Sequence, residues 1–167
     1  MKKGFTLAEI VIVVSVVSII TAIVGRGLSS ALSQQMLNND VERVVSAIQR
    51  ARSYTLASRG NQSGTGRRYG VSFDTTTDPD QFVIYDYSTS ESSEVETQKL
   101  SESTFSSSQK ILFTRLTGVV QEPGAGGSFV DIHQNISITL TSKRQPTLKR
   151  DIVISLTGVV EIKQSAS

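Results

Sequence analysis

The sequence predicts an α+β protein in which one long amino-terminal α-helix packs on a carboxyl-terminal antiparallel β-sheet head. Two observations support this prediction. No proline occurs before Pro79, and apolar residues recur at three- and four-residue steps over residues 28–51, as they do in a helix. From Arg67 onward, apolar and polar residues alternate in short runs that turn residues separate, as they do in antiparallel strands. The length of 167 residues suits one modest domain with an appendage.

The segment from Phe5 to Gly25 is mostly apolar and is expected to form a membrane-spanning helix. Its 21 residues would extend about 31 Å as a helix, which is close to the thickness of a bilayer hydrocarbon core. Lys2 and Lys3 precede the segment and Arg26 follows it, so the charge bias favours a cytoplasmic amino terminus. We therefore expect a single-pass protein of the cytoplasmic (inner) membrane with an extracytoplasmic head.

Three interpretations of this amino terminus compete. A secretory signal peptide fits poorly, because Glu9 lies near the start of the apolar run and no A-x-A-like cleavage site follows. A plain signal anchor fits the length and the charge bias but gives no role to Glu9. The third interpretation, a processed precursor, also accounts for the residues around Glu9.

Residues 2–9 read Lys-Lys-Gly and then Phe-Thr-Leu-Ala-Glu. This motif resembles the class III signal of type IV prepilins and type II secretion pseudopilins. The resemblance implies that a prepilin peptidase and methyltransferase reads Lys3, Gly4 and Phe5, cleaves between Gly4 and Phe5, and N-methylates Phe5. Residues 1–4 would then be a leader. Loss of Lys2 and Lys3 would leave 15 basic and 15 acidic side chains, so the net charge of +2 comes from the leader.

Glu9 is the expected assembly residue. A carboxylate in the hydrocarbon region costs about 2.5 kcal/mol or more and needs a compensating partner. The resemblance implies that this partner is the positively charged terminal amine of a neighbouring subunit. Such a pair is strongly position-dependent in a low dielectric and would set the step between subunits. The alternative is an unpaired Glu9 at the membrane interface.

The helix is expected to continue as an amphipathic segment over residues 26–59 and to end at Gly60. The paired glycines Gly25 and Gly27 predict a bend or a melted turn where the helix leaves the membrane. A coiled coil is a weaker alternative, because systematic flanking charges are missing. The apolar stripe consists of Leu28, Leu32, Met36, Leu37, Val41, Val44, Val45, Ile48 and Ala51.

The head is expected to span residues 60–167, with strands near residues 69–73, 82–87, 110–116, 128–132, 136–141, 148–156 and 159–163. The Ser- and Glu-rich segment around residues 88–108 is expected to be a flexible surface loop. Leu-Thr-Gly-Val-Val occurs at residues 116–120 and 156–160, and each copy predicts a strand, a Thr-Gly turn and a strand. The second copy, in the final strands, resembles the H-type minor pseudopilins and the FimT-like minor pilins.

No constellation of catalytic residues is present in the sequence. The chain has no cysteine, His133 is its only histidine, and no serine lies in a G-x-S-x-G motif. We therefore expect no enzyme activity, no metal and no cofactor. The leading interpretation is a structural subunit, a minor pilin or pseudopilin, whose partners are other such subunits, the processing peptidase and the membrane.

Two alternatives remain open. Lys143, Arg144, Lys149 and Arg150 follow one another with no acid between them, and they predict a patch that holds DNA phosphates, as in a DNA-binding minor pilin for DNA uptake. The chain lacks the arginine-rich tail of FimT-like proteins with that role. The other alternative is a membrane-tethered domain outside any filament, which would keep an uncleaved amino terminus.

Overall fold

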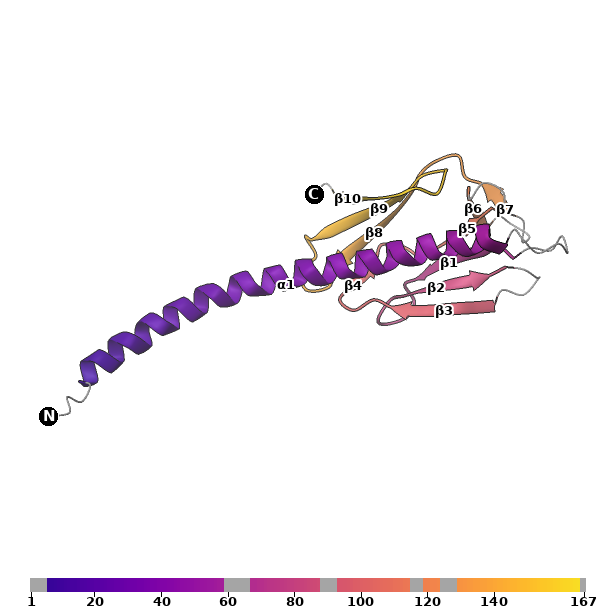
Figure 1. The fold of residues 1–167 in the computed structure, drawn as a ribbon. Coiled ribbons are helices and arrows are strands. Elements are labelled where there is room, and N and C mark those ends of the chain that lie inside the picture. Colours follow the sequence, from indigo (N-terminus) through magenta and orange to yellow (C-terminus); the bar gives the residue numbers. More distant parts are fainter. Residues whose placement is uncertain (1–5, 59–66, 88–92, 115–118, 124–128, 166–167) are drawn as a thin grey trace.

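The computed structural model describes residues 6–58, 67–87, 93–114, 119–123 and 129–165, apart from the side chains of 23–27, 122, 123, 129 and 131. These residues form one long helix, α1 (Leu7–Ala57), and ten strands in two antiparallel sheets. The carboxyl-terminal half of α1 lies against the head, and its amino-terminal half projects well beyond it (Figure 1). The predicted α+β class, with a long helix and antiparallel sheets, is confirmed.

The helix runs without interruption for 51 residues. It begins after Thr6, which accepts a hydrogen bond from the backbone N–H of Glu9 and so satisfies one of the free donors of the first turn. The predicted melted turn at Gly25 and Gly27 is wrong, because the helix continues through both glycines. Two glycines weaken a helix by about 1 kcal/mol each, which the turns on either side outweigh.

The six-stranded sheet has the order β3-β2-β1-β5-β6-β7 and the four-stranded sheet the order β10-β9-β8-β4. Every pair of neighbouring strands is antiparallel. The strands are β1 (Tyr69–Asp74), β2 (Gln81–Asp86), β3 (Ser93–Lys99), β4 (Ser103–Phe105), β5 (Gln109–Phe113), β6 (Val120–Pro123), β7 (Phe129–Asp131), β8 (Ile136–Ser142), β9 (Lys149–Ile154) and β10 (Val160–Gln164).

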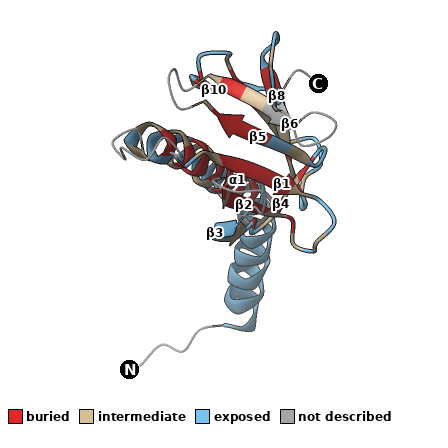
Figure 2. Cartoon of the chain, turned by 90° about the vertical axis from the view of Figure 1, so that its right-hand side faces the viewer, coloured by how far each residue is buried: buried red, intermediate tan, exposed pale blue. Residues whose placement is uncertain are grey.

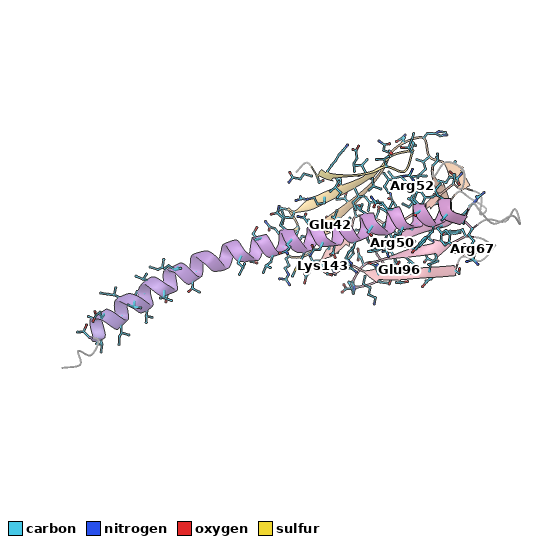
Figure 3. All side chains as sticks on the ribbon, in the orientation of Figure 1. Glu42, Arg50, Arg52, Arg67, Glu96 and Lys143 are labelled. Carbon is cyan, nitrogen blue, oxygen red and sulfur yellow. The ribbon has the colours of Figure 1, made fainter. Side chains whose placement is uncertain are left out.

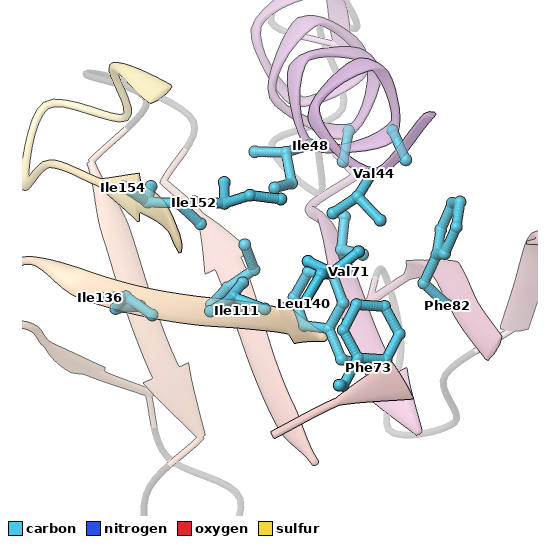
Figure 4. Close-up of a cluster of buried hydrophobic side chains, with 14 of the residues drawn as sticks. Val44, Ile48, Val71, Phe73, Phe82, Ile111, Ile136, Leu140, Ile152 and Ile154 are labelled. Carbon is cyan, nitrogen blue, oxygen red and sulfur yellow. The ribbon is translucent and has the colours of Figure 1, made fainter. Parts of the chain in front are cut away.

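The core lies where α1 meets both sheets. The helix contacts β1, β2 and β5 of one sheet and β4, β8 and β9 of the other. Figure 4 shows Val44 and Ile48 of α1 packed toward side chains of both sheets, among them Val71, Leu140 and Ile152. The predicted apolar stripe enters this core from Leu37 onward: Val45 is partly buried, and the other members are buried, namely Leu37, Val41, Val44, Ile48 and Ala51.

The Ser- and Glu-rich segment is not a loop as predicted. Its described part forms β3, which pairs with β2, and β4, which pairs with β8. Leu100 and Phe105 are buried in the core, and the N–H of Leu100 donates to the carbonyl of Asp80 at 2.8 Å. A strand at the edge of a sheet needs little apolar character of its own, which explains why composition failed to predict β3. Residues 88–92 of the segment are not among the residues that the structure describes.

The two copies of Leu-Thr-Gly-Val-Val lie in two hairpins. The second copy connects β9 to β10, and Gly158 in its turn has a φ of 75°, which glycine adopts at no steric cost. The first copy connects β5 to β6, which pair antiparallel. Residues 116–118 of that copy lie outside the described part of the chain. The predicted hairpin at the carboxyl terminus is confirmed.

Candidate functional site

The amino-terminal half of α1 is apolar on every side and is exposed along its described length (Figure 2). A helix that is hydrophobic all round is normally surrounded by other apolar groups, in a protein core or in a membrane. Within the part of the chain that the structure describes, residues 7–22 are exposed throughout. The exposed fractions lie between 49% and 82% for Leu7, Ile10, Val11, Ile12, Val13, Val14, Val16, Val17, Ile19 and Ile20.

The polar side chains within this apolar segment are satisfied inside the helix. The hydroxyls of Ser15, Ser18 and Thr21 each donate to the carbonyl four residues earlier, at 2.8, 2.7 and 2.8 Å. These bonds occupy the hydroxyl protons, so the groups add little polarity to the surface of the segment. The helix therefore presents a surface suited to an apolar environment.

Glu9 is the one carboxylate of the exposed apolar segment, as far as the side chains are described. It forms a capping box with Thr6: the N–H of Glu9 donates to Thr6 Oγ1 at 3.3 Å, and the N–H of Thr6 donates to Glu9 Oε2 at 3.3 Å. The Thr-x-x-Glu spacing at residues 6–9 is itself a capping-box signal that the sequence interpretation missed. The predicted processing residues Lys3, Gly4 and Phe5 lie outside the described residues.

Within the described part of the chain, no helical stretch combines the length and the apolar character that crossing a membrane requires.

The four basic residues predicted to contact DNA do not form a free cationic patch. The Nζ of Lys143 lies 2.9 Å from Asp78 Oδ1, and Arg144 makes two bonds to the Glu102 carboxylate, at 2.9 and 3.1 Å. The hydrogen bond from Arg144 lowers the pKa of Glu102, and the hydrogen bond to Asp78 raises the pKa of Lys143. Both cations thus have acidic partners that are distant in sequence.

The other two basic residues point in different directions. Lys149 and Arg150 are consecutive residues of β9, and successive side chains of a strand lie on opposite faces of the sheet. Arg150 Nη1 donates to the carbonyl of Lys149 at 3.1 Å. Two of the four cations therefore have acidic partners and the other two lie on opposite faces of β9, and DNA contact at this cluster stays a prediction. His133 lies in an exposed bend, as expected of a surface residue.

A buried carboxylate that the sequence interpretation missed joins α1 to the head. Asp40 is 1% exposed and accepts hydrogen bonds from the backbone N–H groups of Ser101 and Glu102 and from the hydroxyl of Ser103, at 2.8–3.2 Å. Arg43, one turn further along the helix, lies 3.5 Å from the same carboxylate. Asp40 thereby fixes the connection between β3 and β4 to the helix.

Two arginines of α1 hold the helix to opposite sides of the head, as Figure 3 shows. Arg50 Nη1 donates to both carboxylate oxygens of Glu96 on β3, at 2.9 and 3.0 Å. Arg52 Nη2 donates to the carbonyl of Thr157 in the β9–β10 turn at 2.9 Å. The head is therefore attached to the helix through both sheets.

Comparison of the chain with protein-family models, with curated proteins and with solved structures gave no match.

Proposed function

We propose that this chain is a structural subunit, a minor pilin or pseudopilin, of a type IV pilus or a type II secretion-like filament. The observation that supports this proposal is the exposed apolar half of α1, which projects from a folded head and carries a single described carboxylate, Glu9. An apolar surface of that size needs covering. Neighbouring helices in a filament would provide it after assembly, and a bilayer would provide it before.

The proposal has two stages, membrane insertion and then filament assembly. The chain first lies in the cytoplasmic membrane through residues 5–25, with its amino terminus inside and its head outside. This span extends at both ends beyond the residues whose side chains are described. Cleavage after Gly4 and methylation of Phe5 then release a chain that packs into the filament through α1, with the head on the filament surface or at its tip.

Glu9 has a definite role in this proposal. Cleavage would create a positive amine at Phe5, four positions before Glu9. The Glu9 carboxylate would pair with the amine of a neighbouring subunit, and the pair would neutralise both charges in a low dielectric. The capping box with Thr6 holds the carboxylate at the first turn of the helix, close to the terminus where such an amine would arrive.

The test replaces Glu9 with alanine in cells that assemble the filament. We expect Glu9→Ala to enter the membrane at the wild-type level and to lose at least about tenfold in filament incorporation, because a buried pair is worth more than about 1.4 kcal/mol. Glu42→Ala is the matched control, because Glu42 is an exposed glutamate on the same helix beyond the apolar segment. Normal incorporation of the Glu9→Ala variant in sheared filament fractions would reject the pairing.

A further inference from the structure

The last strand of the chain, β10, has one open edge. It ends the four-stranded sheet, where only β9 pairs with it. Its residues from Glu161 to Gln164 are exposed, and Ile162 retains 51% of its surface. Figure 1 shows the strand along the outer margin of the head, near the carboxyl terminus. The edge of such a strand offers N–H and C=O groups that can pair with another strand.

The β9–β10 turn determines which backbone groups of β10 face outward. The N–H of Ser155 donates to the carbonyl of Val159 at 2.9 Å. Hydrogen-bonded positions alternate along an antiparallel ladder, so every second residue counted from Val159 directs its backbone groups toward β9. The intervening residues Val160, Ile162 and Gln164 direct their N–H and C=O groups away from the sheet.

We propose that β10 binds β10 of a second copy of this chain, antiparallel and centred on Ile162. In this register Ile162 lies opposite Ile162 of the second copy, and Val160 lies opposite Gln164 of the second copy. The residues whose backbone groups face outward therefore oppose one another, and each opposed pair exchanges two hydrogen bonds. The two sheets become one continuous sheet across a two-fold axis.

Charge complementarity identifies the occupant as a second copy. In the same register Glu161 lies opposite Lys163 of the second copy, and the two-fold axis repeats this pair. These are the close, non-hydrogen-bonded positions, where Cα atoms are about 4.5 Å apart and opposite charges stabilise the pairing. Within one strand Lys163 Nζ already lies 3.5 Å from Glu161 Oε2, and both side chains are more than half exposed. With the second copy, each Glu161 would have a Lys163 beside it on its own strand and another opposite it on the second strand.

The apolar face of the sheet supports the same register. Ile162 pairs with Ile152 of β9, which is fully buried in the core, so both side chains lie on the inner face. Ile162 is half exposed because it lies at the rim of that face. Pairing would place Ile162 against its symmetry equivalent and would extend the apolar face across the seam, which removes apolar surface from water.

The symmetry determines where the contact can occur. A two-fold axis between antiparallel strands is perpendicular to the sheet, so the α1 helices of the two copies, which lie along the sheets, point in opposite directions. Neighbours in one filament have parallel helices under the proposed function. Under that function, the β10 contact therefore joins heads that belong to two separate filaments. This location of the contact rests on the proposed function. The pairing of the strands itself does not depend on it.

The absence of cysteine from the sequence allows a direct test by disulfide trapping. In the full chain in detergent micelles, Ile162→Cys places two thiols at opposed positions with Cα atoms about 5.5 Å apart, within the range of a disulfide. We expect a disulfide-linked dimer on mild oxidation. Gln164→Cys is the matched control on the same face: its symmetry mate is four residues away, roughly 13 Å, so little dimer should form. Equal trapping of both variants, or none at Ile162→Cys, would overturn the proposal.

A charge exchange provides a second readout in the Ile162→Cys background. Glu161→Lys or Lys163→Glu alone makes both cross-strand pairs like-charged and should slow dimer trapping about tenfold. The double exchange Glu161→Lys with Lys163→Glu restores both pairs and should restore the rate. A double variant as slow as the single variants would contradict this register. Normal filament incorporation together with failed trapping would reject the β10 contact alone and leave the proposed function standing.

Discussion

At the scale of single residues, hydrogen bonds between buried polar groups attach the helix to the head. Such groups need partners because a buried polar group without one is costly. Asp40 is a buried carboxylate among them, and it receives its hydrogen bonds from a connection more than sixty positions away in the chain. A buried carboxylate with several donors is well satisfied, and its removal leaves those donors without this acceptor. The helix and the β3–β4 connection are therefore energetically coupled through one side chain.

We expect Asp40→Ala to lower the free energy of unfolding of the head by about 2–4 kcal/mol, because it leaves two partly buried N–H groups and the buried hydroxyl of Ser103 without this acceptor. Urea denaturation of the full chain in detergent, followed by far-UV circular dichroism, measures the change. Glu42→Ala, two positions away on the exposed side of α1, should change it by no more than about 0.5 kcal/mol. Equal midpoints for the two variants would show that Asp40 does not couple helix and head.

At the scale of the elements, α1 consists of two halves in different surroundings. From Leu37 to Ala51 the apolar stripe packs into the core between the sheets. Leu28 and Leu32 continue the same stripe toward the amino terminus, but they are 57% and 38% exposed. The stripe is therefore buried in the core at one end of the helix and exposed at the other.

This division predicts opposite phenotypes for two similar substitutions. Ile48→Ala removes a fully buried side chain and should cost about 2–5 kcal/mol of head stability, whereas Leu28→Ala should cost little. Under the proposed function, Leu28→Ala should instead reduce incorporation into filaments. Thermal denaturation together with filament fractionation distinguishes the two effects. A destabilised head in Leu28→Ala would contradict the assignment of the exposed half to assembly.

Local pattern in the sequence predicted those elements whose own residues determine their structure. The three- to four-residue period of apolar residues predicted the end of α1 to within two residues. The alternation of apolar and polar residues predicted β1, β2, β8 and the final hairpin. It missed β3 because an edge strand with polar side chains forms through pairing with β2, which no local period reveals. A continuous helix through Gly25 and Gly27 likewise reflects cooperation along α1 rather than local propensity.

The candidate sites follow the same distinction. The motif at residues 2–9 is contiguous, so it could be read from the sequence, and its role stays a prediction. The basic cluster depended on neighbours that the sequence does not show. Asp78 and Glu102 reach Lys143 and Arg144 only after the two sheets have formed. The sequence interpretation missed the hydrogen bonds of Asp40 for the same reason, since their donors lie far along the chain.

At the scale of the whole molecule, a folded head is attached to a helix whose amino-terminal half projects beyond it and is exposed where described (Figures 1 and 2). The head shares its core with the carboxyl-terminal half of α1, and both sheets hold that half of the helix. Among the described residues, 7–22 of the projecting half are exposed throughout. This division between a packed half and an exposed half of the helix is what the proposed subunit requires.

The most direct test of the central claim is mass spectrometry of the intact protein and of its amino-terminal peptide after purification from the native membrane. The proposal predicts a chain that begins at Phe5 and carries one N-methyl group on its amine. A chain that still begins at Met1, in cells with an active prepilin peptidase, would contradict it and would favour a membrane-tethered domain outside any filament.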